Sequence, residues 1–230
     1  MTAQEYLDGT VLLIDKPLEW TSFQAVNKIR WHIKTKFGLK KIKVGHAGTL
    51  DPLATGLLII CAGKETKKIS IYQGQVKEYT GTFTIGETTP SYDLETEVDQ
   101  TFPIEHITEE LLLKTAKKFL GEIDQKPPIF SAIKKDGKRL YELARKGETT
   151  EIASRKVTIS EFDITKIDSH KIHFRVVCSK GTYIRSLAYD FGVALNSGAH
   201  LSSLRRTKIG DFSVNNALSI ENFIKQLELE

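Results

Sequence analysis

One segment of the chain combines a reactive side chain with a constrained backbone: residues 45–58, which read Gly-His-Ala-Gly-Thr-Leu-Asp-Pro-Leu-Ala-Thr-Gly-Leu-Leu. Its glycines and proline predict a tightly folded loop rather than a helix or strand. Pro52 holds Asp51 in an extended or turn conformation, and the apolar run from Leu57 anchors the loop from behind. A carboxylate fixed in this way could act on a bound anion. An aspartate that only caps a turn beside a proline is the alternative.

The rest of the chain offers few other chemistries. His46 has no second histidine, cysteine or acid at metal-ligand spacing, and Cys61 and Cys178 form no Cys-x-x-Cys pair. We find no Walker-type phosphate loop, no Gly-x-Gly-x-x-Gly helix opening and no Gly-x-Ser-x-Gly nucleophile turn. The sequence therefore predicts a reaction that uses no metal and no cofactor.

Charge is distributed unevenly, although the formal net charge is only +4. Between Glu19 and Asp51 there is no acid, but there are seven basic residues: Lys28, Arg30, Lys34, Lys36, Lys40, Lys41 and Lys43. Between Tyr79 and Lys114 there are eight acids and no lysine or arginine, and a second basic group, residues 205–208, comes late. This asymmetry suggests a polyanion bound along one face. Two solvated surfaces of opposite sign are the alternative.

Hydrophobic periodicity predicts the elements that would position these residues. Strands are expected at residues 11–14, 57–62, 78–86 and 171–178. Helices are expected after a cap at Thr21 or Ser22, after a cap at Thr108, after residues 179–182, and from residue 220 to 227. Helices and strands mix without regular β-α-β alternation, which predicts an α+β fold with a largely antiparallel or mixed sheet.

The helix after Thr108 is expected to turn one apolar side inward and to end at Gly121. The side chains expected on that inner side are Leu112, Ala116, Phe119 and Leu120.

Composition limits the class of protein. The chain has 230 residues, of which 40% are hydrophobic and 27% charged, the balance of a globular protein. Its longest apolar run, residues 57–62, is too short to cross a bilayer, and the N-terminus shows no secretory signal. The cysteine usage fits a reducing cytoplasm. No repeat or linker interrupts the chain, so we expect one domain.

Five segments, in order, resemble the motifs of the B-type tRNA pseudouridine synthases, the TruB family. The loop at 45–58 resembles the family signature. The other four matching segments are Asp15-Lys16-Pro17 with Thr21-Ser22; Lys77-Glu78-Tyr79; residues 128–134 with Gly137, Tyr141, Glu142 and Arg145; and residues 178–185 with 198–200 and 204–206. Together they span roughly residues 9–212.

This resemblance implies a fold and an activity. The fold would be that of a pseudouridine synthase, with a central mixed or antiparallel sheet flanked by helices and an active-site cleft across the sheet. Residues 1–212 would form the catalytic domain and residues 213–230 a short helical tail, with the PUA-type subdomain of many bacterial members reduced or absent. The enzyme would isomerise uridine 55 of the tRNA T-loop without a cofactor. Its partner would be the T-arm of tRNA, with no membrane and no obligate protein partner, for a cytoplasmic monomer.

The resemblance also implies residue roles. Asp51 would be the nucleophile, acting on the sugar anomeric carbon, on C6 of uracil or by a glycal route, and Arg185 would keep it ionised. Tyr79 would pack against the uracil ring, which must flip out of the T-loop to reach a buried carboxylate. The implied substrate contacts are His46, Tyr183, the main chain at Leu204, and Asp93. Lys16 and Pro17 would support the loop, and the basic run from Lys28 to Lys43 would meet phosphates.

Some positions leave alternatives. Asp93 lies in the acidic stretch, so a solvated loop acid is its alternative, and a surface arginine on a helix is the alternative for Arg185. Glu19 stands where the family commonly has glycine, so we expect that turn to be altered. An RNA-binding or tRNA-folding module and a synthase acting on other uridines are the competing functions. The joint presence of Asp51, Tyr79 and Arg185 argues against the first, and the lack of extra domains for partner proteins argues against the second.

Overall fold

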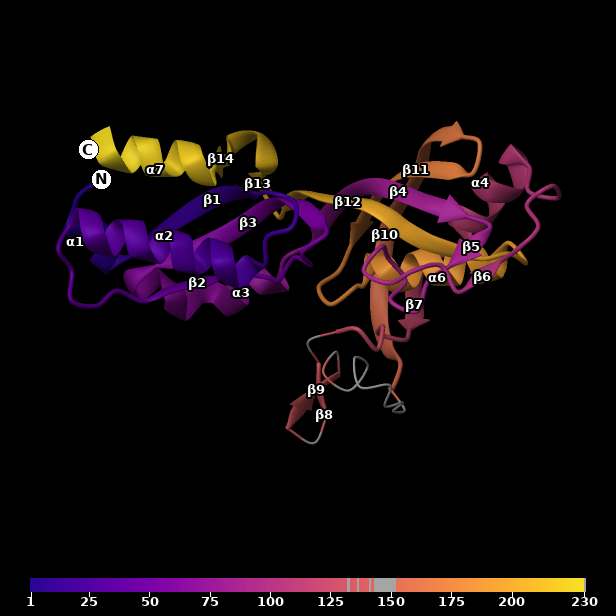
Figure 1. Ribbon diagram of the computed structural model, residues 1–230, viewed down its shortest axis with the longest axis horizontal. Coiled ribbons are helices and arrows are strands. Elements are labelled where there is room, and N and C mark those ends of the chain that lie inside the picture. The colour runs from indigo at the N-terminus through magenta and orange to yellow at the C-terminus, as the bar shows by residue number, and fades with distance from the viewer. Residues whose placement is uncertain (132, 136, 141, 143–151, 230) are drawn as a thin grey trace. The chain divides into compact units, whose positions relative to one another are not determined.

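The computed structural model describes residues 1–131, 133–135, 137–140, 142 and 152–229 (Figure 1). Ala132, Tyr141 and Arg145 of the predicted central motif lie outside the described residues. The chain forms two compact units: unit 1 comprises residues 1–79 and 204–230, and unit 2 comprises residues 80–203. The chain passes from one unit to the other within strands β4 (Lys77–Ile85) and β12 (Ala199–Ile209).

Unit 1 contains a sheet in the strand order β14-β1-β3-β12, with β2 paired to β3 and β13 paired to β12. Its other strands are β1 (Thr10–Lys16), β2 (Val44–His46), β3 (Ala54–Ala62), β13 (Phe212–Ser213) and β14 (Leu218–Ser219). Its helices are α1 (Ala3–Asp8), α2 (Ser22–Lys36), α3 (Ile69–Gly74) and α7 (Ile220–Leu229), with 3-10 helices η1 (Gly63–Lys68) and η2 (Val214–Asn216).

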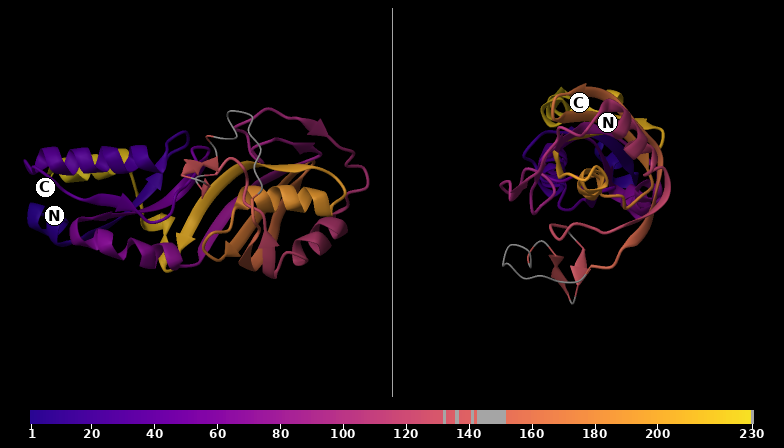
Figure 2. Two further views of the ribbon diagram at one scale, coloured as in Figure 1. Left: turned by 90° about the horizontal axis from the view of Figure 1, so that it is seen from below. Right: turned by 90° about the vertical axis from the view of Figure 1, so that its right-hand side faces the viewer.

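Strand β3 organises the core of unit 1 because both of its faces are buried. Alternate side chains of a strand point to opposite faces. Leu58 and Ile60 therefore join the cluster beneath α2 and α7, whereas Leu57 and Ile59 join a second cluster beside α3. Figure 2 (left) shows α2 and α7 on one side of these strands and α3 on the other. Burial on both faces explains why this segment is a continuous apolar run.

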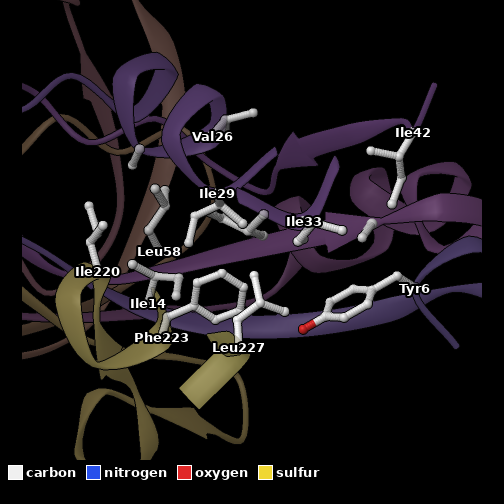
Figure 3. Close-up of a cluster of buried hydrophobic side chains, with 13 residues drawn as sticks. Tyr6, Ile14, Val26, Ile29, Ile33, Ile42, Leu58, Ile220, Phe223 and Leu227 are labelled. Atoms are coloured by element: carbon white, nitrogen blue, oxygen red, sulfur yellow. The ribbon is translucent and has the colours of Figure 1, made fainter. Parts of the chain in front are cut away.

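Helices α2 and α7 close one face of unit 1. Their buried residues recur every three or four positions, and Figure 3 shows Val26, Ile29, Ile33, Ile220, Phe223 and Leu227 meeting over the sheet. The tail at 213–230 thus contributes to the core of unit 1. The division into a catalytic domain at 1–212 and a tail at 213–230 stays a prediction.

Unit 2 contains the strand order β12-β4-β11-β10-β7, with short pairs β5–β6 and β8–β9. Its other strands are β5 (Glu87–Thr88), β6 (Gln100–Thr101), β7 (Gly121–Gln125), β8 (Lys134–Lys135), β9 (Lys138–Arg139), β10 (Arg155–Asp168) and β11 (Lys171–Cys178). Its helices are α4 (Glu109–Lys117) and α6 (Ile184–Ala194). Aromatic rings fill its core, with centroids 4.2–6.4 Å apart among Phe83, Phe162, Phe174 and Phe191.

The predicted α+β class with a mixed sheet is confirmed. The pairs β1–β14 and β3–β12 are parallel, whereas β1–β3, β10–β11 and β7–β10 are antiparallel. The expected strands correspond to β1, β3, β4 and β11, and the expected helices to α2, α4, α6 and α7. In the described part of the chain, none of the helices is both long enough and apolar enough to cross a membrane.

The expected end of the helix after Thr108 was wrong. Helix α4 ends at Lys117, and Gly121 instead opens β7 with a φ of +91°. The backbone N–H of Leu120 donates to the carbonyl of Lys117, three residues back, which makes a tighter turn than an α-helix. Leu120 is consequently 44% exposed rather than turned inward.

Candidate active site

The loop that carries Asp51 is tied down on both sides of that residue. The N–H of Leu50 donates to Ser22 Oγ at 2.9 Å, and the same hydroxyl donates to the carbonyl of Leu50 at 3.1 Å. The carbonyl of Asp51 accepts the N–H of Ala54 at 3.1 Å. Asp51 itself is half-buried. Its backbone is therefore fixed by local hydrogen bonds before any substrate binds.

Ser22 is available for this contact because Thr21 caps helix α2. The hydroxyl of Thr21 accepts the N–H of Gln24 at 3.1 Å, and the side chain of Gln24 accepts the N–H of Thr21 at 2.8 Å. This is a reciprocal capping box. The sequence offered two hydroxyl residues for one cap, and the second proves to hold the loop.

Lys16 lies beneath the same loop and is fully buried. Its ammonium donates to the carbonyls of Trp20 at 2.6 Å, Pro17 at 2.8 Å and Pro52 at 3.4 Å. Burial lowers the pKa of Lys16 to about 8, against the opposing effect of the charge on Asp51. The predicted supporting role of Lys16 and Pro17 stays a prediction.

Glu19 adopts a φ of +64°, the left-handed conformation that favours glycine. Its N–H donates to the carbonyl of Pro52 at 2.8 Å, so this turn also touches the loop. The conformation gives a physical reason for the glycine that the resembling family commonly has there.

Sequence analysis counted Arg206 in a late basic group and in the last resembling segment without assigning it a role, and the structure shows that it is buried. The side chain is 1% exposed and points into the loop. Its Nε donates to the carbonyl of Leu57 at 2.8 Å, its Nη2 to that of Gly48 at 3.0 Å and its Nη1 to that of Thr49 at 3.5 Å. Arg206 therefore holds the two arms of the loop together, a role that no feature of the sequence indicated.

The backbone of Arg206 approaches the loop as closely as its side chain does. A Cβ added to Gly56 would lie 2.3 Å from the carbonyl oxygen of Arg206, and the two residues are partners in the parallel pair of β3 and β12. Gly56 also has a φ of +102°. Any larger residue at this glycine of the loop would push β12 away.

The other predicted site residues of unit 1 lie on its strands. His46 is half-buried on β2, and burial, together with the charge of Arg206, lowers its pKa below the ordinary value. Both effects favour the neutral form of the ring. The carbonyl of Leu204 accepts the hydroxyl of Thr55 at 3.5 Å, and Tyr79 on β4 is 9% exposed.

In unit 2, Arg185 and Asp93 form a buried ion pair. Arg185 Nε lies 3.5 Å from Asp93 Oδ2, and the two residues are 3% and 5% exposed. Arg185 Nη1 also donates to the carbonyl of Ser91 at 3.3 Å, and Asp93 Oδ1 accepts the N–H of Glu95 at 2.9 Å. The alternatives of a surface arginine and a solvated acid are therefore wrong. Asp93 orients Arg185 in the first turn of α6.

Tyr183 is held by a residue that sequence reasoning missed. Gln125 is fully buried, and its amide Nε2 donates to the carbonyl of Tyr183 at 3.0 Å while its Oε1 accepts the N–H of Tyr183 at 2.8 Å. The Arg155 guanidinium lies 4.6 Å from the centroid of the Tyr183 ring, a cation–π arrangement. Because Tyr183 precedes α6, the Gln125 clamp also sets the start of the helix that carries Arg185.

Asp51 belongs to unit 1 and Arg185 to unit 2, so the predicted pairing of these two residues stays a prediction. The same holds for the predicted roles of Tyr79, His46, Tyr183, Leu204 and Asp93.

Comparison with known proteins places the chain in a family. Residues 34–184 match the model of the TruB family pseudouridylate synthase N-terminal domain, and residues 185–229 match that of the tRNA pseudouridylate synthase B C-terminal domain. The chain belongs to the TruB family. It is 72% identical to the tRNA pseudouridine synthase B of Flavobacterium johnsoniae, over 99% of this chain and 100% of that protein. It is 56% identical to that of Phocaeicola vulgatus, over 97% and 95%. The predicted family is confirmed.

Solved structures agree with this placement. The chain resembles the structure described as a Cbf5-Nop10-Gar1 complex with a TM-score of 0.72 and 28% identity, over 98% of this chain and 56% of that one. It resembles an H/ACA RNP bound to a substrate RNA containing 2′-deoxyuridine with a TM-score of 0.70 and 26% identity, over 98% and 55%. The chain spans just over half of those two chains. With the family, this likeness confirms the predicted pseudouridine synthase fold.

Proposed function

We propose that this protein is an isomerase that converts uridine 55 in the T-loop of tRNA to pseudouridine. The observation that carries the proposal is the 72% identity, over the whole length of both chains, to a tRNA pseudouridine synthase B. The reaction breaks the bond from ribose C1′ to uracil N1, forms a bond from C1′ to C5, releases the proton of C5 to a base or to water, and adds a proton at N1. The product has the same atoms and electrons as the substrate overall, so the reaction needs no redox partner, and the proposal includes no metal or cofactor.

Asp51 is the nucleophile of this proposal. A carboxylate can attack C1′ of the sugar or C6 of uracil, or assist a glycal route, only if it is correctly placed and ionised. The bonds from Ser22, Lys16 and Arg206 to the loop support the placement. Arg185 supplies the positive charge that keeps Asp51 ionised, and its burial beside Asp93 supports a fixed orientation.

The remaining roles follow the path of the base. Uracil flips out of the T-loop, enters a cleft across the sheet and packs against Tyr79. His46 stacks in the vacated space, a role supported by its lowered pKa. Tyr183 and the main chain at Leu204 contact the flipped nucleotide, and Asp93 orders the pocket through Arg185.

Substitution of the nucleophile tests the proposal directly. Asp51→Asn keeps the size of the side chain but removes its charge, so we expect no pseudouridine after incubation with an unmodified tRNA transcript, without added metal or nucleotide. Binding of the transcript should change by less than about tenfold, or roughly 1.4 kcal/mol. Mapping of pseudouridine along the transcript provides the measurement, with the wild type as control. Turnover by Asp51→Asn, or modification by the wild type at another uridine, contradicts the proposal.

The proposal includes a monomer that works without an obligate protein partner in the cytoplasm. The burial of both free cysteines, Cys61 and Cys178, supports a reducing compartment. Sedimentation of the purified protein, alone and with tRNA, tests the monomer. A stable dimer, or activity that appears only with an added protein, contradicts this part.

A further inference from the structure

Unit 1 has a basic pocket formed by residues that we have not placed in the candidate active site. Its volume is about 400 Å³. The lining includes Lys41 and Lys43, from the segment between α2 and β2, and Lys64, Thr66 and Lys67, from η1. A concave site of this size is large enough for a phosphate group with the atoms on either side of it.

Most of the positive charge at this pocket has no partner among the described residues. Lys64 Nζ lies 2.7 Å from Asp8 Oδ1, so that lysine is paired. Lys41, Lys43 and Lys67 form no ion pair among the residues that the structure describes, and all three are exposed. Three like charges around one hollow repel one another and attract an anion.

The backbone around the pocket is fixed. Gly63 has a φ of +57°, and a Cβ added to it would lie 2.2 Å from the carbonyl oxygen of Tyr6 and 2.3 Å from that of Leu7. The N–H of Gly63 donates to the carbonyl of Lys43 at 2.9 Å, and the hydroxyl of Thr66 donates to the carbonyl of Gly63 at 2.7 Å. The lysines from the two segments are thus held on one rigid backbone.

We propose that Lys41, Lys43 and Lys67 form a phosphate-binding pocket, and that a backbone phosphodiester of the RNA substrate occupies it. Lysine ammonium groups bind phosphate as point charges and carry no information about the base, so the pocket adds affinity without sequence choice. The identity of the RNA rests on the proposed function, whereas the phosphate chemistry rests on the pocket. Residues 28–43 were predicted to meet phosphates, and the structure adds Lys67 from a separate segment.

The test compares two triple variants with the same change in net charge. Lys41→Gln/Lys43→Gln/Lys67→Gln removes the pocket charge, and Lys114→Gln/Lys117→Gln/Lys118→Gln removes three exposed lysines of unit 2. Affinity for an unmodified tRNA transcript is measured over a series of salt concentrations. We expect the pocket variant to bind about tenfold more weakly near 0.1 M salt and to lose about 2–3 from the slope of log K against log salt. The control variant should keep the wild-type slope.

Steady-state kinetics should also distinguish the pocket variant from the control variant. The pocket variant should raise KM about tenfold and leave kcat unchanged, because phosphate contacts bind substrate and transition state equally. Thermal unfolding of both variants at the wild-type temperature shows that the exposed substitutions leave the fold intact.

Calorimetry with pyrophosphate, without RNA, distinguishes two sources of phosphate. Pyrophosphate binding that the pocket variant loses, with no change in tRNA binding, assigns the pocket to a free phosphate compound. A pocket variant that matches the control with both tRNA and pyrophosphate overturns the proposal. Failure of the wild type to make pseudouridine contradicts the proposed function instead. The binding measurements would still test the pocket in that case.

Discussion

The two units hold their key side chains in different ways. In unit 1, the buried cations Lys16 and Arg206 each donate to three main-chain carbonyls around the Asp51 loop. In unit 2, the buried cation Arg185 pairs with the carboxylate of Asp93. A cation bound to carbonyls fixes the backbone of a loop and keeps its positive charge. A cation paired with a carboxylate has the direction of its own side chain fixed.

The difference suits the two proposed roles. The proposed nucleophile needs a rigid loop, and the carbonyl-bound cations Lys16 and Arg206 supply it. Arg185 needs a defined direction, and the buried pair with Asp93 supplies it. Because each arrangement is buried, removing one partner leaves polar groups without hydrogen bonds, and the resulting losses should differ between the units.

The largest effect is expected at Arg206. Arg206→Met orphans the carbonyls of Gly48, Thr49 and Leu57, so we expect the free energy of unfolding to fall by about 3–5 kcal/mol and kcat to fall steeply. Arg206→Lys keeps the charge and one or two of the hydrogen bonds. It should therefore lose less stability and less kcat than Arg206→Met. Chemical denaturation and single-turnover kinetics provide the measurements. Equal losses in the two variants would show that the retained charge contributes nothing, whereas an Arg206→Lys variant that matches the wild type would show that charge, rather than the carbonyl bonds, dominates in unit 1.

The clamp of unit 2 should have a smaller effect. Gln125→Met breaks both bonds to the backbone of Tyr183, and we expect it to lower the free energy of unfolding by about 2 kcal/mol and to reduce kcat more than it raises KM. Glu122→Gln is the matched control, because Glu122 lies on the same strand and its side chain makes an exposed ion pair with Lys156. A control as damaging as Gln125→Met would mean that β7, not the clamp, is the sensitive feature.

A pH experiment measures the energetic cost of a partly buried carboxylate in unit 2, which can be set beside the buried Lys16 of unit 1. Burial raises the pKa of Asp190, on α6, to about 6, whereas it lowers that of Lys16 to about 8. Between about pH 4 and 6 the folded state keeps the Asp190 proton that the unfolded state has lost, so stability falls as pH rises through this range.

Above about pH 6 Asp190 is ionised in both the folded and the unfolded state, and the folded state bears the full cost of burying the charge. Asp190→Asn should therefore raise the free energy of unfolding at pH 7 by about 1–2 kcal/mol. The stability difference between Asp190→Asn and the wild type should vanish near pH 4. Thermal unfolding of the variant and the wild type at the two pH values provides the measurement. A variant that is destabilised at pH 7 would show that Asp190, like Asp93, has a partner that offsets its burial.

The smallest effect is expected at Glu19. Glu19→Gly relieves the left-handed backbone, and we expect it to raise the free energy of unfolding by about 0.5 kcal/mol with unchanged kcat. Glu19→Ala should be neutral or slightly destabilising, because alanine meets the same strain. Thermal unfolding of both variants gives the comparison. A loss of activity in Glu19→Gly would mean that the side chain, and not the turn, matters to the loop.

Sequence reasoning predicted the elements whose local signals agree with their final environment. The capping residues at Thr21 and Thr108 and the alternating strands β4 and β11 were recognisable because each signal depends on neighbours within a few residues. Strand β10 was missed, because six of its fourteen residues are charged and its outward side chains mask the alternation.

The residues of the candidate site likewise fall into those that local sequence signals indicate and those that they do not. Asp51 was predicted because glycine and proline spacing indicates a tight loop and because the loop resembles a family signature, and its role stays a prediction. Gln125, Ser22 and Arg206 were not assigned their roles, since each acts on backbone atoms that are distant in sequence. The presence of a glutamine, a serine or an arginine in a sequence does not indicate which distant carbonyl or N–H its side chain will bind.

Neighbouring residues on β12 make the distinction concrete. The sequence by itself determined that residues 205 and 206 are both arginines, and it established the family and therefore the reaction. Only the tertiary structure decided that Arg205 pairs with Asp15 at 2.6 Å on the more exposed side of the strand, while Arg206 is buried against the Asp51 loop. The physical reason is the pleat of a strand: successive side chains point to opposite faces, and only the packed sheet determines which face is interior.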